Sequence, residues 1–424
     1  MSDLGWIDAA LTSARPQAVG ALLRYFRDID LAEEAFQEAC LRALKHWPQN
    51  GPPRDPAAWL IFVGRNAALD HVRRRSRLAP LPDEAALSDL EDQEDATLER
   101  LDAADYRDDI LRLMFVCCHP DLPATQQIAL ALRIVSGLSV RRIASAFLVS
   151  DAAMEQRITR AKSRIAAAGV AFETPGAVER AERLASVAAM LYLVFNEGYS
   201  ASHGEVARRA PLCDEAIRLT RLLLRLFPAE PEVMGLVALM LLQHARLPAR
   251  FDSQGGVILL EDQDRSLWNA QMIAEGLALI DKAMRHARPG PYQIQAAIAA
   301  LHARAATAPE TDWVQIERLY AALEYSQPSP VITLNRAVAV AKVQGPQAAL
   351  DLIDPLAQRL SNYFHYHGVR GAMLLQLDRR DEARMAFDRA IALANTPAEA
   401  AQIRLHIDKL SQESGAETQS GHAS

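Results

Sequence analysis

Residues 139–165, SVRRIASAFLVSDAAMEQRITRAKSRI, form two short helical patterns separated by a turn. Ser139 and Ser150 each precede one pattern, and serine favours this place because its hydroxyl accepts a hydrogen bond from a free N–H of the first helical turn. In the second pattern the apolar residues recur every three or four positions, as one buried helix face requires. They are Met154, Ile158, Ala161 and Ile165. Two short helices joined by a tight turn, with a basic free face on the second, predict a helix-turn-helix.

The free face of the second helix holds the candidate DNA-binding residues. In a helix-turn-helix, the first turn of this helix meets base edges and later basic residues meet phosphates. Gln156 suits an adenine edge, and Glu155 can accept a hydrogen bond from cytosine. The alternative is an ordinary helical hairpin with solvated arginines. The candidate set is Ser150, Ala153, Glu155, Gln156, Arg157, Arg160, Lys162 and Arg164.

An earlier block, residues 15–80, also has helical periodicity. Asp55 followed by Pro56 predicts a helix start, since a carboxylate caps the first turn and proline fits its first position. The preceding WPQNGPPRDP is interpreted as a loop because it holds four prolines and a glycine. The helix carries Trp59 and ends with four arginines within residues 73–77. This combination favours a separated DNA strand held by stacking and phosphate contacts; a solvated helix end is the alternative.

The formal net charge of −7 is unevenly distributed along the 424 residues. Residues 1–80 carry a net +2 and residues 106–168 a net +4, whereas residues 81–105 carry −9 and residues 169–424 carry −4. The basic stretches coincide with the two helical blocks, so the acidity of the whole chain does not exclude nucleic-acid binding. Residues 81–105 hold few large apolar residues and are interpreted as a mobile acidic linker. A solvated helix is an equally good interpretation of the second half of this segment.

Together the two blocks resemble an extracytoplasmic-function (ECF) sigma factor of bacterial RNA polymerase, within the sigma-70 family. Three motifs carry the resemblance, in the order that the family has them. They are Ala32-Glu33-Glu34 with Gln37-Glu38; Trp59-Leu60 with Arg65-Asn66, Asp70 and Arg73-Arg74-Arg75; and Gly137-Leu138-Ser139 with Ile143-Ala144 and residues 150–165. The resemblance implies an all-α chain with a region 2 bundle at residues 10–80, the acidic linker, and a region 4 helix-turn-helix at residues 106–168.

The resemblance also implies partners and roles. The partners are core RNA polymerase, through its β′ clamp and β flap, and promoter DNA. The candidates for core binding are Glu33, Glu34, Gln37 and Glu38. The candidates for the −10 element are Asn50, Arg54, Trp59, Arg65, Asn66, Asp70, Arg73, Arg74, Arg75 and Arg77. The eight helix-turn-helix residues are assigned to the −35 element. Ala153 and Glu155 stand where the family often has a threonine and a basic residue, so base specificity is not carried over.

About 250 residues follow region 4, and their pattern is again helical. HYHGVRGAMLLQLDRRDEARMAFDRAIAL (365–393) and VITLNRAVAVAKVQGPQAALDLIDPLA (331–357) each predict a helix, a short turn and a second helix. A repeat of about 34 residues is typical of stacked helix pairs. Residues 175–412 are therefore expected to form a tetratricopeptide (TPR)-like α-solenoid, with a disordered tail at residues 413–424.

Two polar, glycine-bearing stretches, Tyr192–Ser202 and Pro248–Trp268, interrupt this pattern. They resemble segments of ECF factors that carry a TPR-like extension, and they are interpreted as a regulatory contact for another protein or for this chain itself. The alternative is a set of inter-repeat loops held by their own salt bridges. The candidate residues are Asn196, Glu197, Arg250, Asp252, Glu261, Asp264 and Arg265.

The sequence contains no pattern typical of catalysis, metal binding or cofactor binding. The four cysteines lack metal-ligand spacing, and there is no glycine-rich phosphate loop or nucleophile elbow. We therefore expect no enzymatic activity, no catalytic residue, no metal and no cofactor. The N-terminus does not resemble a signal peptide, and the apolar runs are shorter than a membrane span. A cytoplasmic protein without membrane contact is expected.

The leading hypothesis is a sigma factor that directs core polymerase to specific promoters and is modulated by its C-terminal helical repeats. The alternative is a TPR-containing helix-turn-helix regulator or scaffold that binds DNA without acting as a sigma subunit. The first block discriminates between them, because such a regulator has no need of the core-binding and −10 motifs.

Overall fold

The computed structural model describes most of the chain. The described residues are 5–51, 53–76, 103–168, 177–199, 203–252, 256–394, 400 and 403. They form helices joined by turns, with one isolated antiparallel bridge between Phe251 and Val257, so the predicted all-α fold class is confirmed. Most of the predicted acidic linker and the whole predicted tail lie outside the described residues. The chain divides into two compact units, residues 1–197 and 198–424.

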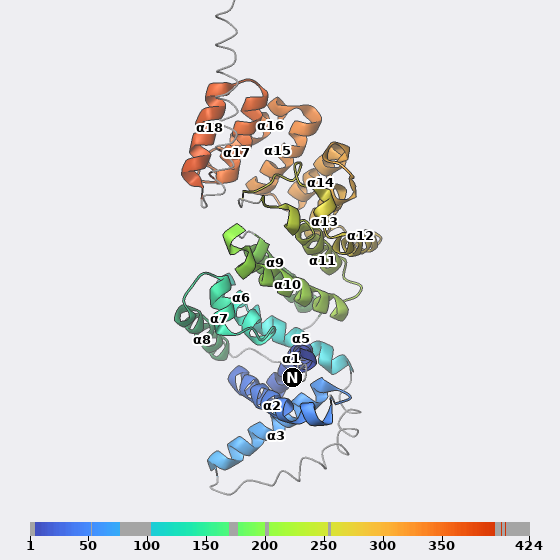
Figure 1. The fold of residues 1–424 in the computed structure, drawn as a ribbon, viewed down its shortest axis with the longest axis vertical. Coiled ribbons are helices and arrows are strands. Elements are labelled where there is room, and N and C mark those ends of the chain that lie inside the picture. The colour runs from blue at the N-terminus through green and yellow to red at the C-terminus, as the bar shows by residue number, and fades with distance from the viewer. Residues whose placement is uncertain are drawn as a thin grey trace, which may run out of the picture. The chain divides into compact units, whose positions relative to one another are not determined.

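The first unit is a bundle followed by a helix-turn-helix (Figure 1). In the bundle the first helix packs against the next two and against α5. A Cβ at Gly20 would lie 2.7 Å from the backbone oxygen of Asp109, and one at Gly64 would lie 2.8 Å from that of Ala35. Glycine therefore permits a closer helix approach than any other residue would. The helices are α1 (Gly5–Phe26), α2 (Ile29–Asn50), α3 (Pro56–Ser76), α5 (Ala103–Cys117), α6 (Ala124–Ile134), α7 (Val140–Ala146), α8 (Asp151–Ala167) and α9 (Ala177–Tyr199), and the last two residues of α9 belong to the second unit.

The prediction of a loop from Trp47 onward is wrong at its start, because α2 continues to Asn50 with Pro48 inside it. Trp47 is only 1% exposed, and its ring centroid lies 6.3 Å from that of Trp6 and 5.4 Å from that of Trp59. The burial of this indole stabilises the extra helical turn. This stabilisation offsets the backbone hydrogen bond that Pro48 cannot donate. The turn ends at a glycine with a positive φ of 81°.

The predicted start of α3 is confirmed by its first hydrogen bonds. Asp55 Oδ1 accepts from the backbone N–H groups of Ala57 and Ala58, at 2.9 and 3.1 Å. Pro56 occupies the first helical position, where its missing N–H costs nothing. The predicted −10 residues Trp59, Arg65 and Asn66 are therefore all carried on one regular helix.

The predicted helix-turn-helix is confirmed in α6, α7 and α8. The hydroxyl oxygens of Ser139 and Ser150 accept hydrogen bonds from the N–H groups of Arg142 and Ala153, at 3.3 and 3.2 Å. Leu148, with φ 53°, makes the tight turn between α7 and α8. The predicted stripe of Met154, Ile158, Ala161 and Ile165 is buried, and α8 packs with it against α6 and α7.

The second unit is built from successive helix pairs, and α17 and α18 match the last predicted repeat. A Cβ at Gly371 would lie 2.6 Å from the ring of Phe387, so the ring of this α18 residue packs directly on the backbone of α17. The pair α15 and α16 matches the preceding repeat. The helices are α10 (His203–Leu226), α11 (Pro231–His244), α12 (Ala270–Met284), α13 (Pro291–Arg304), α14 (Trp313–Ser326), α15 (Pro330–Gln344), α16 (Pro346–Ile353), α17 (Phe364–Gln376) and α18 (Arg380–Leu393).

The two predicted interruptions differ from each other. Within Tyr192–Ser202, residues 192–199 are not irregular but form the last two turns of α9, because their apolar residues continue the spacing of that helix, and residues 200–202 lie outside the described residues. Residues 248–252 and 256–268 are irregular apart from the 3₁₀ turns η2 (Leu247–Ala249) and η3 (Arg265–Leu267) and the bridge between Phe251 and Val257, and residues 253–255 lie outside the described residues. The remaining 3₁₀ turns are η4 (Ala308–Glu310) and η5 (Asp354–Leu356).

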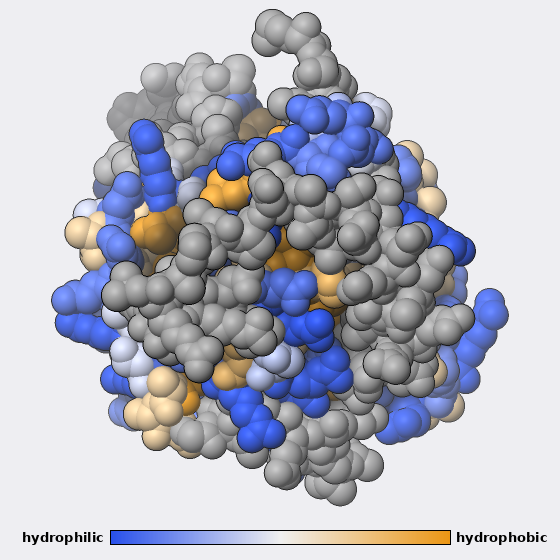
Figure 2. Space-filling view, turned by 90° about the horizontal axis from the view of Figure 1, so that it is seen from below, coloured by the Kyte–Doolittle hydropathy of each residue, from blue (hydrophilic) through white to orange (hydrophobic). Residues whose placement is uncertain are grey.

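The described surface is largely polar where Figure 2 views it, with smaller apolar patches between hydrophilic residues. Among the helices that the structure describes, none combines the length and the apolar character that crossing a membrane requires.

Candidate functional site

The outer face of α2 carries three of the four predicted core-binding residues. Glu34 and Gln37 are exposed, and Glu38 is half-buried and pairs with Arg42 at 3.1 Å. Glu33 differs from them, because it lies on the inner side of the helix and is only 5% exposed. The motif that looked uniform in the sequence is therefore divided between two faces of one helix.

The same outer face exposes leucines that the sequence analysis missed. Leu31, Leu41 and Leu44 are 38%, 56% and 48% exposed, and helical geometry places them beside Glu34 and Gln37. Leucines grouped on a solvent-facing helix indicate a contact surface for a partner. In the sequence these leucines stand outside the alanine-rich stripe that α2 buries. This position was the signal that could have identified them as exposed.

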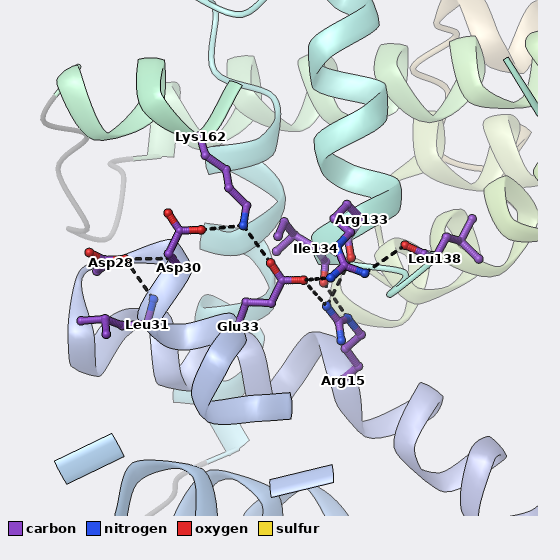
Figure 3. A network of polar contacts seen from close by, with 9 residues as sticks. All are labelled: Arg15, Asp28, Asp30, Leu31, Glu33, Arg133, Ile134, Leu138 and Lys162. Atoms are coloured by element: carbon purple, nitrogen blue, oxygen red, sulfur yellow. Dashed lines mark hydrogen bonds and ion pairs between the residues drawn. The ribbon is translucent and has the colours of Figure 1, made fainter. Parts of the chain in front are cut away.

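Glu33 lies at the centre of an ion network that joins the bundle to the helix-turn-helix (Figure 3). Its Oε1 lies 2.8 Å from Arg133 Nη2 of α6 and 3.5 Å from Arg15 Nη2 of α1. Its Oε2 lies 2.9 Å from Lys162 Nζ of α8, which also contacts Asp30 Oδ1 at 2.6 Å. We call these five residues the Glu33 network.

The cations of the Glu33 network are held from several sides. Arg15 donates through Nε to the carbonyl of Ile134 at 2.9 Å, and its guanidinium lies 4.8 Å from the ring centroid of Phe36. Burial lowers the pKa of Arg15, and the nearby Glu33 carboxylate opposes this shift. Burial alone would also lower the pKa of Lys162, but its bonds to Asp30 and Glu33 outweigh that effect and raise it. The neighbouring carboxylates therefore favour the charged forms of both cations.

Two predicted interface residues thus contact each other in this structure. Glu33 was assigned to core polymerase and Lys162 to the −35 element, yet the two side chains form one ion pair. A cleft of about 710 Å³ lies beside this pair, between the start of α2 and the exposed side of α8. No sequence signal pointed to Arg15 or Arg133, because they lie 18 and 100 positions from Glu33.

The predicted −10 residues lie on α2, on α3 and on the segment between them. Trp59 is half-buried, with its ring stacked 6.5 Å from that of His46, and Asn50 is hydrogen-bonded to the same histidine. Arg65 lies 5.8 Å from the ring centroids of both Tyr25 and Phe62. The others are Arg54, which is exposed; Asn66, which is half-buried; Asp70, Arg73, Arg74 and Arg75, which lie on α3 with side chains outside the described residues; and Arg77, which lies outside them altogether.

Most of the predicted −35 residues lie on the free side of α8. Ala153, Glu155, Gln156 and Arg160 are exposed, and Arg157 is half-buried. Ser150 also acts as the helix cap, and Arg164 donates to Gln126 Oε1 at 3.3 Å. Lys162 belongs to the Glu33 network. The sequence pattern did not single out Arg141 and Arg142, which are exposed on α7, the helix that crosses the phosphate backbone in this motif.

The predicted regulatory residues are divided between the two units of the chain. Asn196 and Glu197 lie on α9 in the first unit, whereas the other five lie in the second. Arg250 donates to the carbonyl of Tyr199 at 2.6 Å, Glu261 pairs with Lys342 at 2.9 Å, and Arg265 donates to the carbonyls of His302 and Ala305. Asp252 and Asp264 accept backbone N–H groups within their own loops.

The adjacent thiols of Cys117 and Cys118 are buried at the end of α5. Burial raises the pKa of Cys118 to about 12, and burial also raises the pKa of Cys117 well above its usual value. Both therefore carry their protons at neutral pH, whereas a metal ion binds the thiolate form.

Comparison with known proteins identifies the first unit. Residues 11–78 match the model of sigma-70 region 2, residues 112–165 that of sigma-70 region 4, and residues 183–284 that of a family of unknown function (DUF6596). A probable ECF RNA polymerase sigma factor, SigI, of Mycobacterium tuberculosis is 30% identical over 168 residues, which are 39% of this chain and 56% of that protein. The chain is an ECF-like sigma factor of the sigma-70 family.

A second relative covers nearly all of the sigma factor, its second unit included. An uncharacterized protein of Rhizobium meliloti (strain 1021) is 71% identical over 413 residues, covering 97% of this chain and 98% of that protein. No solved structure matches the chain. The region 2 match spans α1–α3 and the region 4 match spans the end of α5 through α8. A role in transcription initiation follows for these elements, with core polymerase and promoter DNA as partners.

Proposed function

We propose that this sigma factor directs core polymerase to specific promoters through three surfaces. The outer face of α2 contacts the β′ clamp, α3 and the segment before it contact the −10 element, and α8 reads the −35 element while the region 4 domain contacts the β flap. One observation carries this proposal. The same chain holds an exposed face of leucines and acidic residues on α2 and a helix-turn-helix whose basic helix α8 is capped by Ser150.

Within this proposal the outer residues of α2 bind first. Glu34, Gln37 and Leu41 are exposed in the free chain, so they can meet the clamp without rearrangement. Glu33 and Lys162 are paired in the free chain, so their contacts with polymerase and DNA require the Glu33 network to open. The sigma factor therefore exchanges one set of ion pairs for another when it joins the polymerase.

The second unit is proposed to modulate this activity. Three features support a regulatory role. The unit is long, it has its own buried core, and it contains none of the residues assigned to the three surfaces. Truncation after Tyr199 preserves all of α9 and should change the transcript yield with core polymerase.

Run-off transcription tests the proposed function. Core polymerase of the same bacterium is incubated with its fragmented genomic DNA, with and without the full chain, and the 5′ ends of transcripts are sequenced. We expect transcript starts that depend on the chain and share −35 and −10 elements. Arg160→Ala should weaken them, and Arg304→Gln, an exposed control in the second unit, should not. DNA binding by the chain without such transcripts would favour the regulator that does not act as a sigma subunit.

A further inference from the structure

The second unit contains a cavity of about 570 Å³ that no surface of the proposed function uses. It lies between the loop before η3 and helices α13, α14, α15 and α17. Its size falls within the range of about 300–1,000 Å³ that small-molecule sites occupy. The walls are mainly apolar and include the aromatic rings of Trp313, Tyr320 and Phe364.

One end of this cavity is positively charged. Arg265 and Lys342 line it, and Glu261 is the carboxylate that accompanies them. The pair of Lys342 and Glu261 is 41% and 51% exposed, and ion pairs with this exposure are weak. Arg265 uses Nη1 to bind two backbone carbonyls, and its Nε and Nη2 have no acceptor among the described residues. Donors and positive charge therefore remain for a ligand.

Further arginines reinforce the positive field behind Arg265. Arg246 donates to the hydroxyl of Tyr199 at 2.7 Å and Arg250 to the carbonyl of the same residue. Within the part of the chain that the structure describes, none of these three guanidiniums has a carboxylate within 4 Å. Glu310 acts on Arg265 at longer range but is exposed and already accepts the hydroxyl of Thr307.

The state of His302 agrees with this field. Burial, with Arg246 and Arg265 adding to its effect, lowers the pKa of His302 to about 4. The imidazole is therefore neutral at physiological pH and adds no charge to the cavity that it lines. Arg265 and Lys342 each carry a positive charge and Glu261 a negative one, so the charged end keeps a formal excess of one positive charge.

We propose that this cavity binds an amphipathic small molecule with an apolar, ring-sized body and one anionic group. The anionic group meets Lys342 and Arg265, displacing Glu261 from its weak pair. The body lies against Trp313 and Tyr320. The proposed binding depends on the cavity alone. Only an effect of the bound molecule on transcription would depend on the proposed function.

Calorimetric titration of the purified full chain tests this inference with two matched probes. 1-Naphthylacetate carries the anion, and 1-naphthylacetamide has the same shape without the charge. We expect saturable 1:1 binding of the acid, at least about 10-fold tighter than that of the amide, because charge-assisted hydrogen bonds need the anion. Lys342→Gln should weaken only the acid, by about 5- to 10-fold, and Arg304→Gln, an exposed control outside the cavity, should change neither.

A cavity-filling variant shows whether the acid binds at this site. A Cβ added at Gly368 of α17 would meet only the Cδ1 atom of Ile403, at 3.5 Å, so Gly368→Leu fits the helix and extends into the cavity. We expect it to weaken acid binding by at least about 10-fold without lowering the melting temperature. Equal binding of acid and amide, no binding of either, or full binding by Gly368→Leu would overturn the proposal.

Two further outcomes keep the inference separate from the proposed function. Binding only after removal of residues 405–424 would mean that this segment occupies the cavity, and it would overturn the proposal. Because the titration contains no polymerase, a sigma factor that fails it can still support run-off transcription, and a chain that fails run-off transcription can still bind the acid.

Discussion

Replacing Glu33 by Gln should destabilise the first unit, because this change removes the charge at the centre of the Glu33 network. Breaking a buried ion pair from one side costs about 3–5 kcal/mol. The cost here should be lower, about 2–3 kcal/mol, since Arg15 keeps the carbonyl of Ile134 and Lys162 keeps Asp30. For a unit of this size that change lowers the melting temperature by roughly 5–10 °C.

Scanning calorimetry and hydrogen exchange of the full chain measure this effect. Glu34→Gln is the matched control, because the neighbouring carboxylate is exposed and has no ion pair in the described structure. We expect the Glu33→Gln loss to persist at 0.5 M salt, since buried pairs are poorly screened. Faster exchange should appear in α1, α6 and α8, which the network joins.

A double-mutant cycle decides whether the network acts as a unit. Glu33→Gln and Arg133→Gln remove the two ends of the 2.8 Å contact, so their effects should be non-additive by about 1–2 kcal/mol. Equal stability of Glu33→Gln and Glu34→Gln, or strict additivity in the cycle, would refute the reasoning.

Three other surfaces give expected outcomes. Arg160→Ala, on the exposed side of α8, should weaken −35 binding about 3- to 10-fold and reduce the log–log salt slope by about 0.9 in fluorescence anisotropy, and an unchanged slope would exclude a phosphate contact. Leu41→Asp should weaken core binding by about 10-fold while the melting temperature stays within about 1 °C, because this side chain is 56% exposed; unchanged affinity in a pull-down titration would remove it from the interface. Lowering the pH from 6.5 to 4 should cost the second unit about 2–3 kcal/mol, because the pKa of His302 is lowered to about 4 and only the unfolded chain takes up its proton in that window. Urea unfolding of His302→Gln should show a flatter profile there, and an equal slope would contradict the assignment.

The helix caps and buried stripes were predictable because they depend on neighbours in the chain. Ser139, Ser150 and Asp55 each cap the helix that follows, and the stripe of α8 is buried as its spacing requires. The start of the loop after α2 was not predictable in this way. The proline-rich composition favoured a loop from Trp47, but the packing of its indole against two other tryptophans prolongs the helix.

The sequence by itself determined the all-α class, the helix-turn-helix and the two sigma regions, because periodicity, caps and motif order are local properties. Only the tertiary structure separated Glu33 from Glu34, since burial depends on which helices pack against α2. The partners of Glu33 come from positions 15, 133 and 162, and their pairing with it leaves no local trace in the chain. The cavity of the second unit is likewise a product of packing, because its charged end and aromatic walls come from separate helices.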